Sequence, residues 1–576
     1  MDRTAWIAVV LCVVGLVVWQ VYVAKQVQPK PVTVGAAAET PGATPLLSPS
    51  ASLSPNQSQP AASPVPSAKP SPSVAAFAET TEKLSNTDVE FQITNRGGGI
   101  AHAVLLNHKA QDDQTVVLNS PDHPPIGAIL EDPAAPSLPE YKVSRQGDTV
   151  VCERVTPEQV TIRKKYSFVP TNDGKDNYLG ALDIDFENKG TQPFHNNGYF
   201  LALGSAVPTH VKDYPSYTRV VWSVDGRAKG IDLTWFGGGG GFLGLVNKRA
   251  PQPYYQENFP KPAEWAAVTN QFFATIIAPL DAKADSVWGH RFDIDATQNL
   301  NGIEGAVHFP TLNVAPGQTS TARFQIWAGP KIYHRLARLD QNQAEIMNFG
   351  MFKIISQFLL NFMNWLHSLV GSYGIAILLL TTVIRLVLWP VQAKANKSMR
   401  QTAVLAPKMQ ELREKYKDDP TKMNQEVMKL YKQYGINPVG GCLPMMIQIP
   451  IFFGLYTMLG QAVELRNQSF LWVTDLSQPD TIAQVLGYKI NLLPIAMAAT
   501  QVWLMAMTPK TGDATQRRVM MFTPLIFFFI CYNFAAALAL YYTAQNLFSI
   551  LQFYQNKKQP MPTLEKVAPA GKARKK

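Results

Sequence analysis

The pattern of apolar and polar positions changes sharply near residue 349. Beyond it lie uncharged apolar runs at residues 439–459, 490–507 and 519–554, which are 21, 18 and 36 residues long. About 20 helical residues cross the hydrocarbon core of a bilayer. The two shorter runs therefore predict one membrane span each. The longest predicts two spans folded as a hairpin, with the turn near Tyr532-Asn533-Phe534.

Two further apolar runs bring the prediction to six spans. Residues 373–390 carry one charge, Arg385, and residues 6–24 carry none. The N-terminal run fits an uncleaved anchor better than a signal peptide, because no A-x-A cleavage site directly follows it and it is longer than a usual signal core. Residues 29–78 contain eleven prolines among many Ser and Ala, which predicts a tether without a packed core.

Short alternating stretches between residues 80 and 330 predict β-strands. They are separated by turn signals such as Asn95-Arg96-Gly97-Gly98, and the clearest are residues 88–94, 160–168, 181–187, 291–296 and 321–327. Alternation with period two, broken by Gly, Asn, Asp and Pro, is typical of an all-β sandwich.

Residues 349–369 predict an amphipathic helix. Their polar positions recur at gaps of three or four residues, at Lys353, Gln357, Asn361, Asn364 and Ser368. Such spacing places the polar groups on one narrow stripe, which favours a helix lying in the membrane interface. A spanning helix is the alternative.

The distribution of charge predicts the topology. The formal net charge is +10, and residues 391–436 hold ten Lys/Arg against five acids. Residues 510–518 and the C-terminal tail are also rich in Lys and Arg. Such segments stay on the cytoplasmic side. Six spans place all three there, with both termini inside and the β domain in the periplasm.

The basic segment 391–436 predicts two helices packed as an antiparallel hairpin. Apolar positions repeat at helical gaps on both sides of a break at Asp418-Asp419-Pro420. An Asp cap followed by Pro at the first helical position is a strong helix start. Pro407 should kink or restart the first arm.

The predicted fold is a multi-domain membrane protein. It combines an α-helical bundle of six transmembrane helices, a periplasmic all-β sandwich and a cytoplasmic helical hairpin. Its predicted parts are an anchor (1–25), a tether (26–79), the β-sandwich (80–335), an interfacial helix (348–369), a second span (372–390), the basic hairpin (391–436), spans at 438–460, 490–508, 518–533 and 535–555, and a basic tail (556–576).

Arg385 is the most informative single residue. It lies five positions before Pro390, so it could reach the headgroups by snorkelling. The alternative is a cation facing a water-filled cavity, where it would attract polar or acidic segments of a passing chain. Gln448 and the polar residues of 541–546 also lie in predicted spans. A single polar residue in a span usually forms a hydrogen bond to a neighbouring helix. Several polar residues together with an Arg predict a hydrated groove.

Other motifs indicate no enzyme. The glycine run 237–241 begins a formal G-x-G-x-x-G match without the strand–helix context of a dinucleotide site, so it reads as a loop. No Walker A, G-x-S-x-G or H-E-x-x-H pattern occurs, and the four cysteines show no metal-like spacing. We expect no cofactor, metal or nucleotide-driven step.

Specific motifs now point to a family. Residues 406–459, with 365–390 and 540–552, closely resemble the YidC family, relatives of the mitochondrial oxidase-assembly and chloroplast Albino insertases. The β region with Thr94-Asn95-Arg96-Gly97-Gly98 is similar to the periplasmic domain of Gram-negative members. The resemblance implies a bacterial inner-membrane insertase and chaperone that is not an enzyme. Its implied partners are nascent membrane proteins, the SecYEG translocon, the ribosome and membrane lipids, with no specific nucleic acid.

The resemblance also implies site residues. The family's groove residues match Arg385, Thr381 and Tyr542. The polar span residues Gln448 and Asn546 complete the predicted groove for the client. A slide for the incoming transmembrane segment would include Met445, Ile449, Phe453, Met521, Leu525 and Phe528. Contact with the ribosome or another partner would involve Lys408, Arg413, Lys415, Lys417, Lys422, Arg517, Arg518 and Lys575.

One feature departs from the family pattern. The usual Pro-Ser-Gly-like turn between the last two spans is replaced by Asn533-Phe534-Ala535-Ala536-Ala537, which has weaker turn chemistry. Two other function classes stay open. A transporter or channel would need a through-path and usually repeated halves. A membrane-anchored periplasmic carbohydrate-binding protein would leave the additional spans unexplained.

Overall fold

The structure is a computed structural model. It describes residues 77–110, 114–170, 177–211, 213–238, 249–295, 297, 300–436, 443–485, 488–507 and 514–557. The predicted N-terminal anchor, the tether and the basic tail beyond residue 557 lie outside these residues. So does most of the glycine run.

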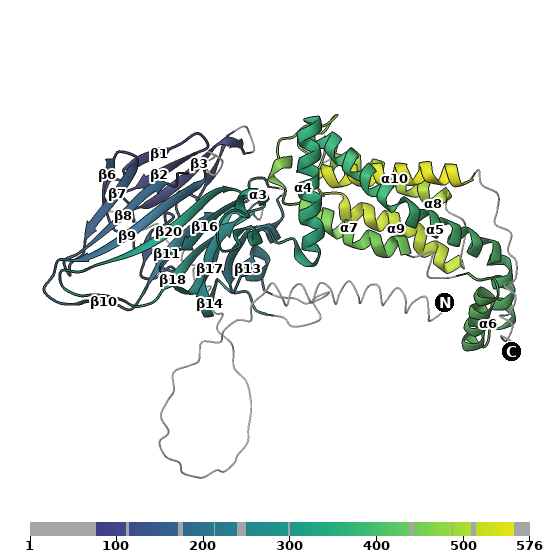
Figure 1. The fold of residues 1–576 in the computed structure, drawn as a ribbon, viewed down its shortest axis with the longest axis horizontal. Helices are drawn as coiled ribbons and strands as arrows, with labels where there is room; N and C mark the ends of the chain where they lie inside the picture. The colour runs from purple at the N-terminus through teal and green to yellow at the C-terminus, as the bar shows by residue number, and fades with distance from the viewer. Residues whose placement is uncertain are drawn as a thin grey trace, which may run out of the picture.

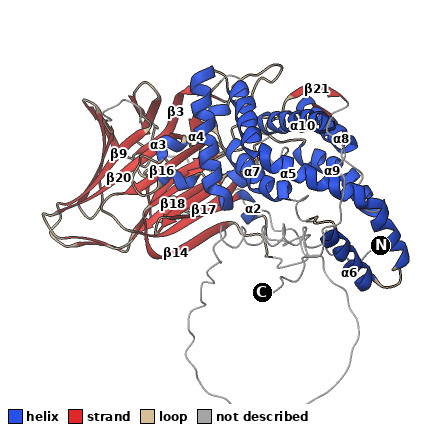
Figure 2. Cartoon of the chain, turned by 45° about the vertical axis from the view of Figure 1, so that its right-hand side comes forward, coloured by secondary structure: helices blue, strands red, loops and turns tan. Residues whose placement is uncertain are grey.

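Residues 77–330 form the predicted β domain, in which two antiparallel sheets pack face to face (Figures 1 and 2). The larger sheet has the order β13-β12-β15-β16-β20-β9-β8-β7-β6. Its strands are β6 (Lys142–Gln146), β7 (Thr149–Val155), β8 (Val160–Phe168), β9 (Leu179–Asn188), β12 (Arg219–Val224), β13 (Arg227–Asp232), β15 (Trp265–Thr269), β16 (Phe273–Pro279) and β20 (Thr319–Pro330).

The second sheet has the order β14-β17-β18-β11-β5. Its strands are β5 (Ile129–Leu130), β11 (Tyr199–Ala206), β14 (Tyr254–Ala263), β17 (Ala284–Asp295) and β18 (Leu300–Phe309). Smaller sheets hold β1 (Thr81–Ser85), β2 (Val89–Thr94), β3 (Gly99–Lys109) and β4 (Thr115–Leu118), the pair β10 (Phe194–Asn196) and β19 (Leu312–Val314), and the pair β21 (Thr481–Val485) and β22 (Tyr488–Asn491).

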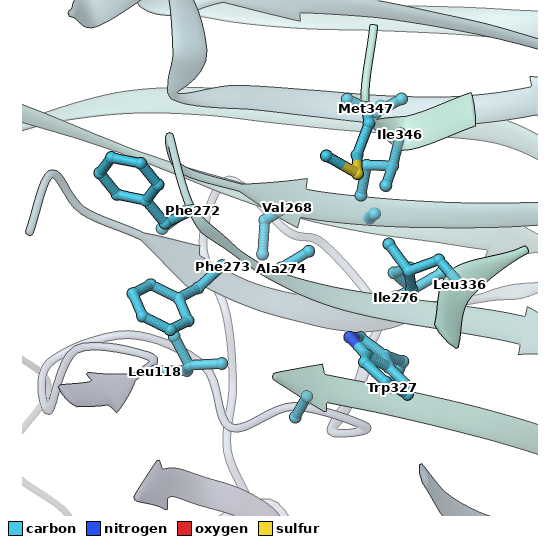
Figure 3. Packing of buried hydrophobic residues seen from close by; sticks show 14 of the residues in the cluster. Leu118, Val268, Phe272, Phe273, Ala274, Ile276, Trp327, Leu336, Ile346 and Met347 are labelled. Carbon is cyan, nitrogen blue, oxygen red and sulfur yellow. The ribbon is translucent and has the colours of Figure 1, made fainter. Parts of the chain in front are cut away.

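The alternating stretches coincide with strands because every second side chain enters the core between the sheets. In β8, for example, Val160, Ile162, Lys164 and Tyr166 are buried. This core includes Phe272, Phe273, Ile276 and Trp327, whose side chains are drawn in Figure 3. The prediction of a β-rich domain is confirmed.

In the part of the chain that the structure describes, seven longer helices follow the β domain, and Figure 1 shows their arrangement. They are α4 (Lys353–Val370), α5 (Tyr373–Lys415), α6 (Pro420–Gln433), α7 (Leu443–Leu459), α8 (Leu492–Met507), α9 (Ala514–Cys531) and α10 (Ala536–Lys557), and short turns of helix are α2 (Leu233–Phe236), α3 (Tyr333–Leu336), η2 (Pro215–Tyr217), η4 (Gln343–Ile346), η5 (Gly350–Phe352) and η7 (Val463–Leu465). Among described residues, only α5 is both long and apolar enough to count as a membrane span by those two criteria, while Met446–Leu459 and Leu492–Met507 are shorter apolar helices.

Helix α5 contains both the predicted second span and the first arm of the predicted basic hairpin. Its 43 residues run through Pro390 and Pro407 without a break, because a proline removes one backbone donor while the neighbouring residues keep the helical pairing. At about 1.5 Å per residue, α5 is about 65 Å long. Its C-terminal part packs against α6 through Leu405, Met409 and Tyr431. Asp419 caps α6, accepting a hydrogen bond from Lys422 N, with Pro420 in the first turn.

The long apolar run 519–554 is divided as its length predicted. Helix α9 ends at Cys531 and α10 begins at Ala536. The weak turn sequence between them is supported from outside. The first two backbone N–H groups of α10 donate to the carbonyls of Gln478 and Leu476 at 2.9 and 3.0 Å, and Tyr214 of the β domain donates its hydroxyl to Asn533 O. Neighbouring segments thus supply the hydrogen-bond partners that the local turn sequence lacks.

Helix α4 lies between the β domain and the other helices and runs crosswise to them (Figures 1 and 2). Leu359, Leu360 and Met363 are buried against the bundle. The predicted polar stripe is flanked by an exposed apolar stripe, formed by Ile354, Phe358, Trp365 and Leu369. An apolar face beside a polar stripe agrees with the predicted amphipathic helix.

Candidate functional site

Arg385 lies on α5 where this helix meets α10. Its guanidinium donates to the carbonyl of Gln545 at 3.1 Å and to the hydroxyl of Ser549 at 2.8 Å. Its Nε is buried without a hydrogen-bond partner. No ion pair of Arg385 occurs among the described residues, so its charge is met only by neutral oxygens. A cation with a spare donor in this setting can still attract a further acceptor.

The acceptors for Arg385 belong to a stripe along α10. Tyr541, Gln545 and Ser549 are spaced four residues apart, so they lie on one face of the helix. Gln448 of α7 completes the group, because its amide nitrogen lies 3.2 Å from Gln545 Oε1 and 3.5 Å from the Tyr541 hydroxyl. We call Arg385, Gln448, Tyr541, Gln545 and Ser549 the Arg385 cluster.

Three predicted groove residues lie outside this hydrogen-bonded group. Thr381 is buried and donates its hydroxyl to Ile377 O of its own helix. Tyr542 is buried against the rings of Phe452 and Phe527, with centroids at 5.4 Å in both cases. Asn546 turns toward α8.

The amide of Asn546 donates to Met497 O and to the Thr500 hydroxyl, at 3.2 and 3.1 Å. It therefore ties α10 to α8, on another side of α10 from Arg385. Ser549 was not among the predicted polar residues, and Tyr541 and Gln545 were noted only as part of the polar stretch 541–546 and not as groove residues. The sequence signal that could have found them is their regular spacing of four residues within an apolar helix.

The predicted slide residues lie on α7 and α9. Ile449 and Leu525 are exposed at 42% and 50%, whereas Phe453 and Phe528 are half-buried. The side chains of Met445 and Met521 lie outside the described residues. Helix α9 also exposes Phe522, Ile526, Phe529 and Ile530, so it presents a broad apolar face.

The predicted partner-contact residues lie around the packed ends of α5 and α6. Lys408, Lys415, Lys417 and Lys422 are exposed, and Arg413 is half-buried. Lys408 Nζ donates to the Tyr434 hydroxyl, and Lys415 and Lys422 lie over the ring of Tyr416. The side chains of Arg517, Arg518 and Lys575 lie outside the described residues.

The β domain holds its own buried charged groups. Lys164 donates to the carbonyls of Gly97 and Gly127 at 2.8 and 2.9 Å, and burial lowers its pKa to about 7. Glu304 accepts from His123 and His290 at 2.6 and 2.8 Å. Burial alone would raise the pKa of Glu304, but its hydrogen bonds and charge interactions with the two histidines together outweigh burial and lower the pKa. Both arrangements tie loops to the sheets.

Comparisons with solved structures give low similarity. A structure titled "Active YidC insertase crystal structure with the first transmembrane domain resolved" matches 84% of this chain and 94% of that chain, at 19% identity and a TM-score of 0.34. A galactose mutarotase related enzyme from Lactobacillus acidophilus matches 43% of this chain at 12% identity, with a TM-score of 0.28. The second match is partial and covers less than half of the chain.

Sequence comparisons cover nearly the whole chain. The family model of the YidC periplasmic domain matches residues 82–362, and that of the 60Kd inner membrane protein matches residues 365–562. A membrane protein insertase YidC from Nitratidesulfovibrio vulgaris is 41% identical over 50% of this chain and 52% of its own length, so this match spans about half of that relative. One from Syntrophus aciditrophicus is 30% identical over 97% of this chain and 100% of its own length. This chain therefore belongs to the YidC family of bacterial inner-membrane proteins.

Proposed function

We propose that this protein inserts transmembrane segments of client proteins into the bacterial inner membrane and helps them fold, through a hydrophilic groove at the Arg385 cluster. Relatives that carry the name membrane protein insertase support this function. The observation that carries the site is a cationic side chain between apolar helices, met only by neutral acceptors and keeping a buried donor without a partner.

We propose a topology of six spans for this function. They are residues 6–24, the first half of α5, and α7, α8, α9 and α10. The long basic end of α5 and α6 would then form a cytoplasmic hairpin. Helix α4 would lie in the periplasmic interface with Ile354, Phe358 and Trp365 toward lipid, since it runs crosswise to the predicted spans (Figure 1).

The proposed mechanism begins with a polar segment of the client. Arg385 and its neighbouring amides and hydroxyls lower the free energy cost for this segment to leave bulk water, because each can replace a hydrogen bond with water. The apolar segment of the client then moves along the exposed faces of α7 and α9 into lipid. Its own hydrophobic transfer supplies the driving force, so no nucleotide hydrolysis is required. The YidC family is not an enzyme family, in agreement with this scheme.

We further propose that the exposed lysines around α6 contact the ribosome during synthesis, and that clients are received alone or from the SecYEG translocon. Lys408, Lys415, Lys417 and Lys422 are all exposed and could bind phosphate groups. Replacing all four with Gln should weaken co-sedimentation with ribosomes while leaving insertion of a completed client unchanged.

Depletion of the protein tests the proposed function. Cells are depleted and then given a pulse-labelled single-span client with a tag on its periplasmic side. Protease protection measures whether the tag has crossed the membrane. We expect the fraction translocated to fall on depletion and to recover with the intact chain. Unchanged translocation in depleted cells would contradict the proposal.

A further inference from the structure

The first part of the connection between α7 and α8, residues 460–480, is a structural bracket for the helices. Its Gln478 and Leu476 carbonyls cap α10 by accepting from Ala536 N and Ala537 N. Its Asp480 carboxylate caps α8 by accepting from Leu493 N at 2.6 Å. Both helix starts thus have their free N–H groups bound by this one segment.

The same segment also binds the β domain. Gln271 Nε2 donates to Gly460 O at 2.8 Å, and Gln478 Nε2 donates to Asp213 Oδ1 at 3.1 Å. The buried guanidinium of Arg466 lies over the rings of Phe272 and Phe273, 5.4 and 5.1 Å from their centroids. Residues 460–480 are therefore fixed on one side by the β domain and on the other by the helix ends.

A tight turn projects from this fixed segment. Phe470 and Val473 exchange both backbone hydrogen bonds at 2.9 Å, which leaves Leu471 and Trp472 at the tip. Leu471 has a φ of +54°, in the region where glycine or asparagine is preferred and a leucine is strained. The tip residues nevertheless point outward, with 72% of Leu471 and 45% of Trp472 exposed. Two large apolar side chains at the corner of a strained turn would be unfavourable in water.

The turn sits at the ends of two proposed membrane spans. The ring of Phe470 packs directly against Gly374 in the first turn of α5 and leaves no room for a Cβ there. Trp472 Nε1 donates at 3.1 Å to Asp480, the residue that caps α8. Ile375, which follows Gly374 on α5, is 42% exposed. The tip thus continues the apolar surface of a spanning helix at the level of its periplasmic end.

The composition of the turn also fits a lipid surface. Residues 467–474 read NQSFLWVT and contain no charged side chain. Tryptophan is enriched where hydrocarbon meets headgroups, because its ring is apolar and its N–H can still find a polar partner. The Trp472 indole meets both conditions, since its ring is exposed and its N–H is bound to Asp480.

We infer that Leu471 and Trp472 insert into the periplasmic leaflet of the bilayer and anchor residues 460–480 to lipid. The bracket then connects three bodies, namely the bilayer, the starts of α8 and α10, and the β domain. It holds the β domain at a fixed height and orientation over the membrane. The anchor depends on the proposed spans but not on client insertion.

Lipid quenching of a label at the tip tests this anchor. The full chain carries Leu471→Cys, with its native cysteines replaced, and is labelled with the environment-sensitive dye NBD. It is reconstituted into vesicles of phosphatidylethanolamine and phosphatidylglycerol that contain a lipid with a nitroxide near the headgroup. We expect lipid quenching to be about twofold stronger, and iodide quenching about twofold weaker, than at a control site in water.

Two matched controls make the result decisive. The first control is Val155→Cys, since Val155 on β7 of the β domain is 59% exposed. The second is Ser469→Cys, since Ser469 is exposed within residues 460–480 but outside the tip. Equal quenching at positions 471 and 155 would overturn the inference. Protection from iodide without lipid quenching would also overturn it, because the tip would then contact protein. Since client insertion is not measured, failure here leaves the insertase proposal standing.

Discussion

Two cations, Lys164 in the β domain and Arg385 in the helical part, show how differently the two halves of the molecule use a charge. Lys164 in the β domain is 0% exposed, and its ammonium is bound by two backbone carbonyls and lies 4.9 Å from the centroid of the Tyr141 ring. Arg385 in the helical part is half-buried and binds one carbonyl and one hydroxyl, while its Nε has no partner.

We attribute this difference to two roles: a structural charge at Lys164 and, in our proposal, a charge available to a client at Arg385. Lys164 is enclosed by the loops that it ties down, at Gly97 and Gly127, so no client can reach it. Arg385 binds Gln545 O and the Ser549 hydroxyl of α10, and the Gln545 side chain in turn binds Gln448 of α7, so these groups can exchange hydrogen bonds. A buried polar group with unused capacity is costly to keep, and we attribute its presence here to function.

The largest effect is expected from reversing the charge of Arg385. Arg385→Glu would repel acidic client segments and lose both hydrogen bonds to α10, so insertion of a single-span client should fall about tenfold or more. Protease protection in cells with the variant as sole copy measures this. Arg385→Lys keeps the charge and should retain most activity. Equal insertion by the Glu and Lys variants would show that the charge has no role.

A smaller effect is expected from removing one neutral member of the cluster. Gln545→Leu keeps the carbonyl that Arg385 uses but deletes the acceptor for Gln448. Polar contacts between membrane helices contribute about 0.6 kcal/mol, so insertion should fall about threefold. The matched control is Leu547→Ala, since Leu547 is exposed on the same helix. An unchanged insertion rate in Gln545→Leu would remove this residue from the site.

The charge of Lys164 in the β domain should affect the stability of the fold and not client insertion. Burial lowers the pKa of Lys164 from 10.5 to about 7. Between these pH values the unfolded chain binds more protons than the folded chain, so the free energy of unfolding rises with pH. In Lys164→Met this rise between pH 7 and 9 should shrink by about 2 kcal/mol.

Thermal unfolding of the solubilised full chain at pH 7 and pH 9 measures the slope of the free energy of unfolding against pH. Lys331 is a matched site, because burial lowers its pKa to about 7 as well, and Lys331→Met should reduce the slope similarly. A slope in Lys164→Met equal to that of the unchanged chain would contradict the proposed protonation behaviour. Loss of client insertion in this variant at a temperature where it is folded would break the distinction between the two cations.

Periodicity predicted much of the fold because burial itself is periodic. Strand β8 begins and ends at the residues of its alternating stretch, Val160 and Phe168. The turn between α9 and α10 lies where the length of the apolar run required it. The support for that turn could not be predicted, because its partners are Gln478, Leu476 and Tyr214, which are distant in the sequence.

The candidate site was only partly predictable for the same reason. Arg385 and Gln448 are conspicuous as polar residues in apolar runs, and the structure brings them to the same stretch of α10. Which face of α10 meets them depends on the rotation of that helix, which is set by packing. Asn546 and Gln545 are neighbours in sequence, yet Asn546 binds α8. The predicted groove included Asn546 and not Gln545, whereas the hydrogen bonds of the Arg385 cluster include Gln545 and not Asn546.

Site-specific crosslinking of a stalled nascent client tests the central claim most directly. A photoreactive amino acid is placed at Gln448 or Ser549, which are half-buried members of the Arg385 cluster, or at Asn546 on the side of α10 that faces α8. We predict strong adducts with the client's transmembrane region at positions 448 and 549, and only background at 546. Adducts at 546 equal to those at 448 and 549, or none at 448 and 549, would contradict a client path along the Arg385 cluster.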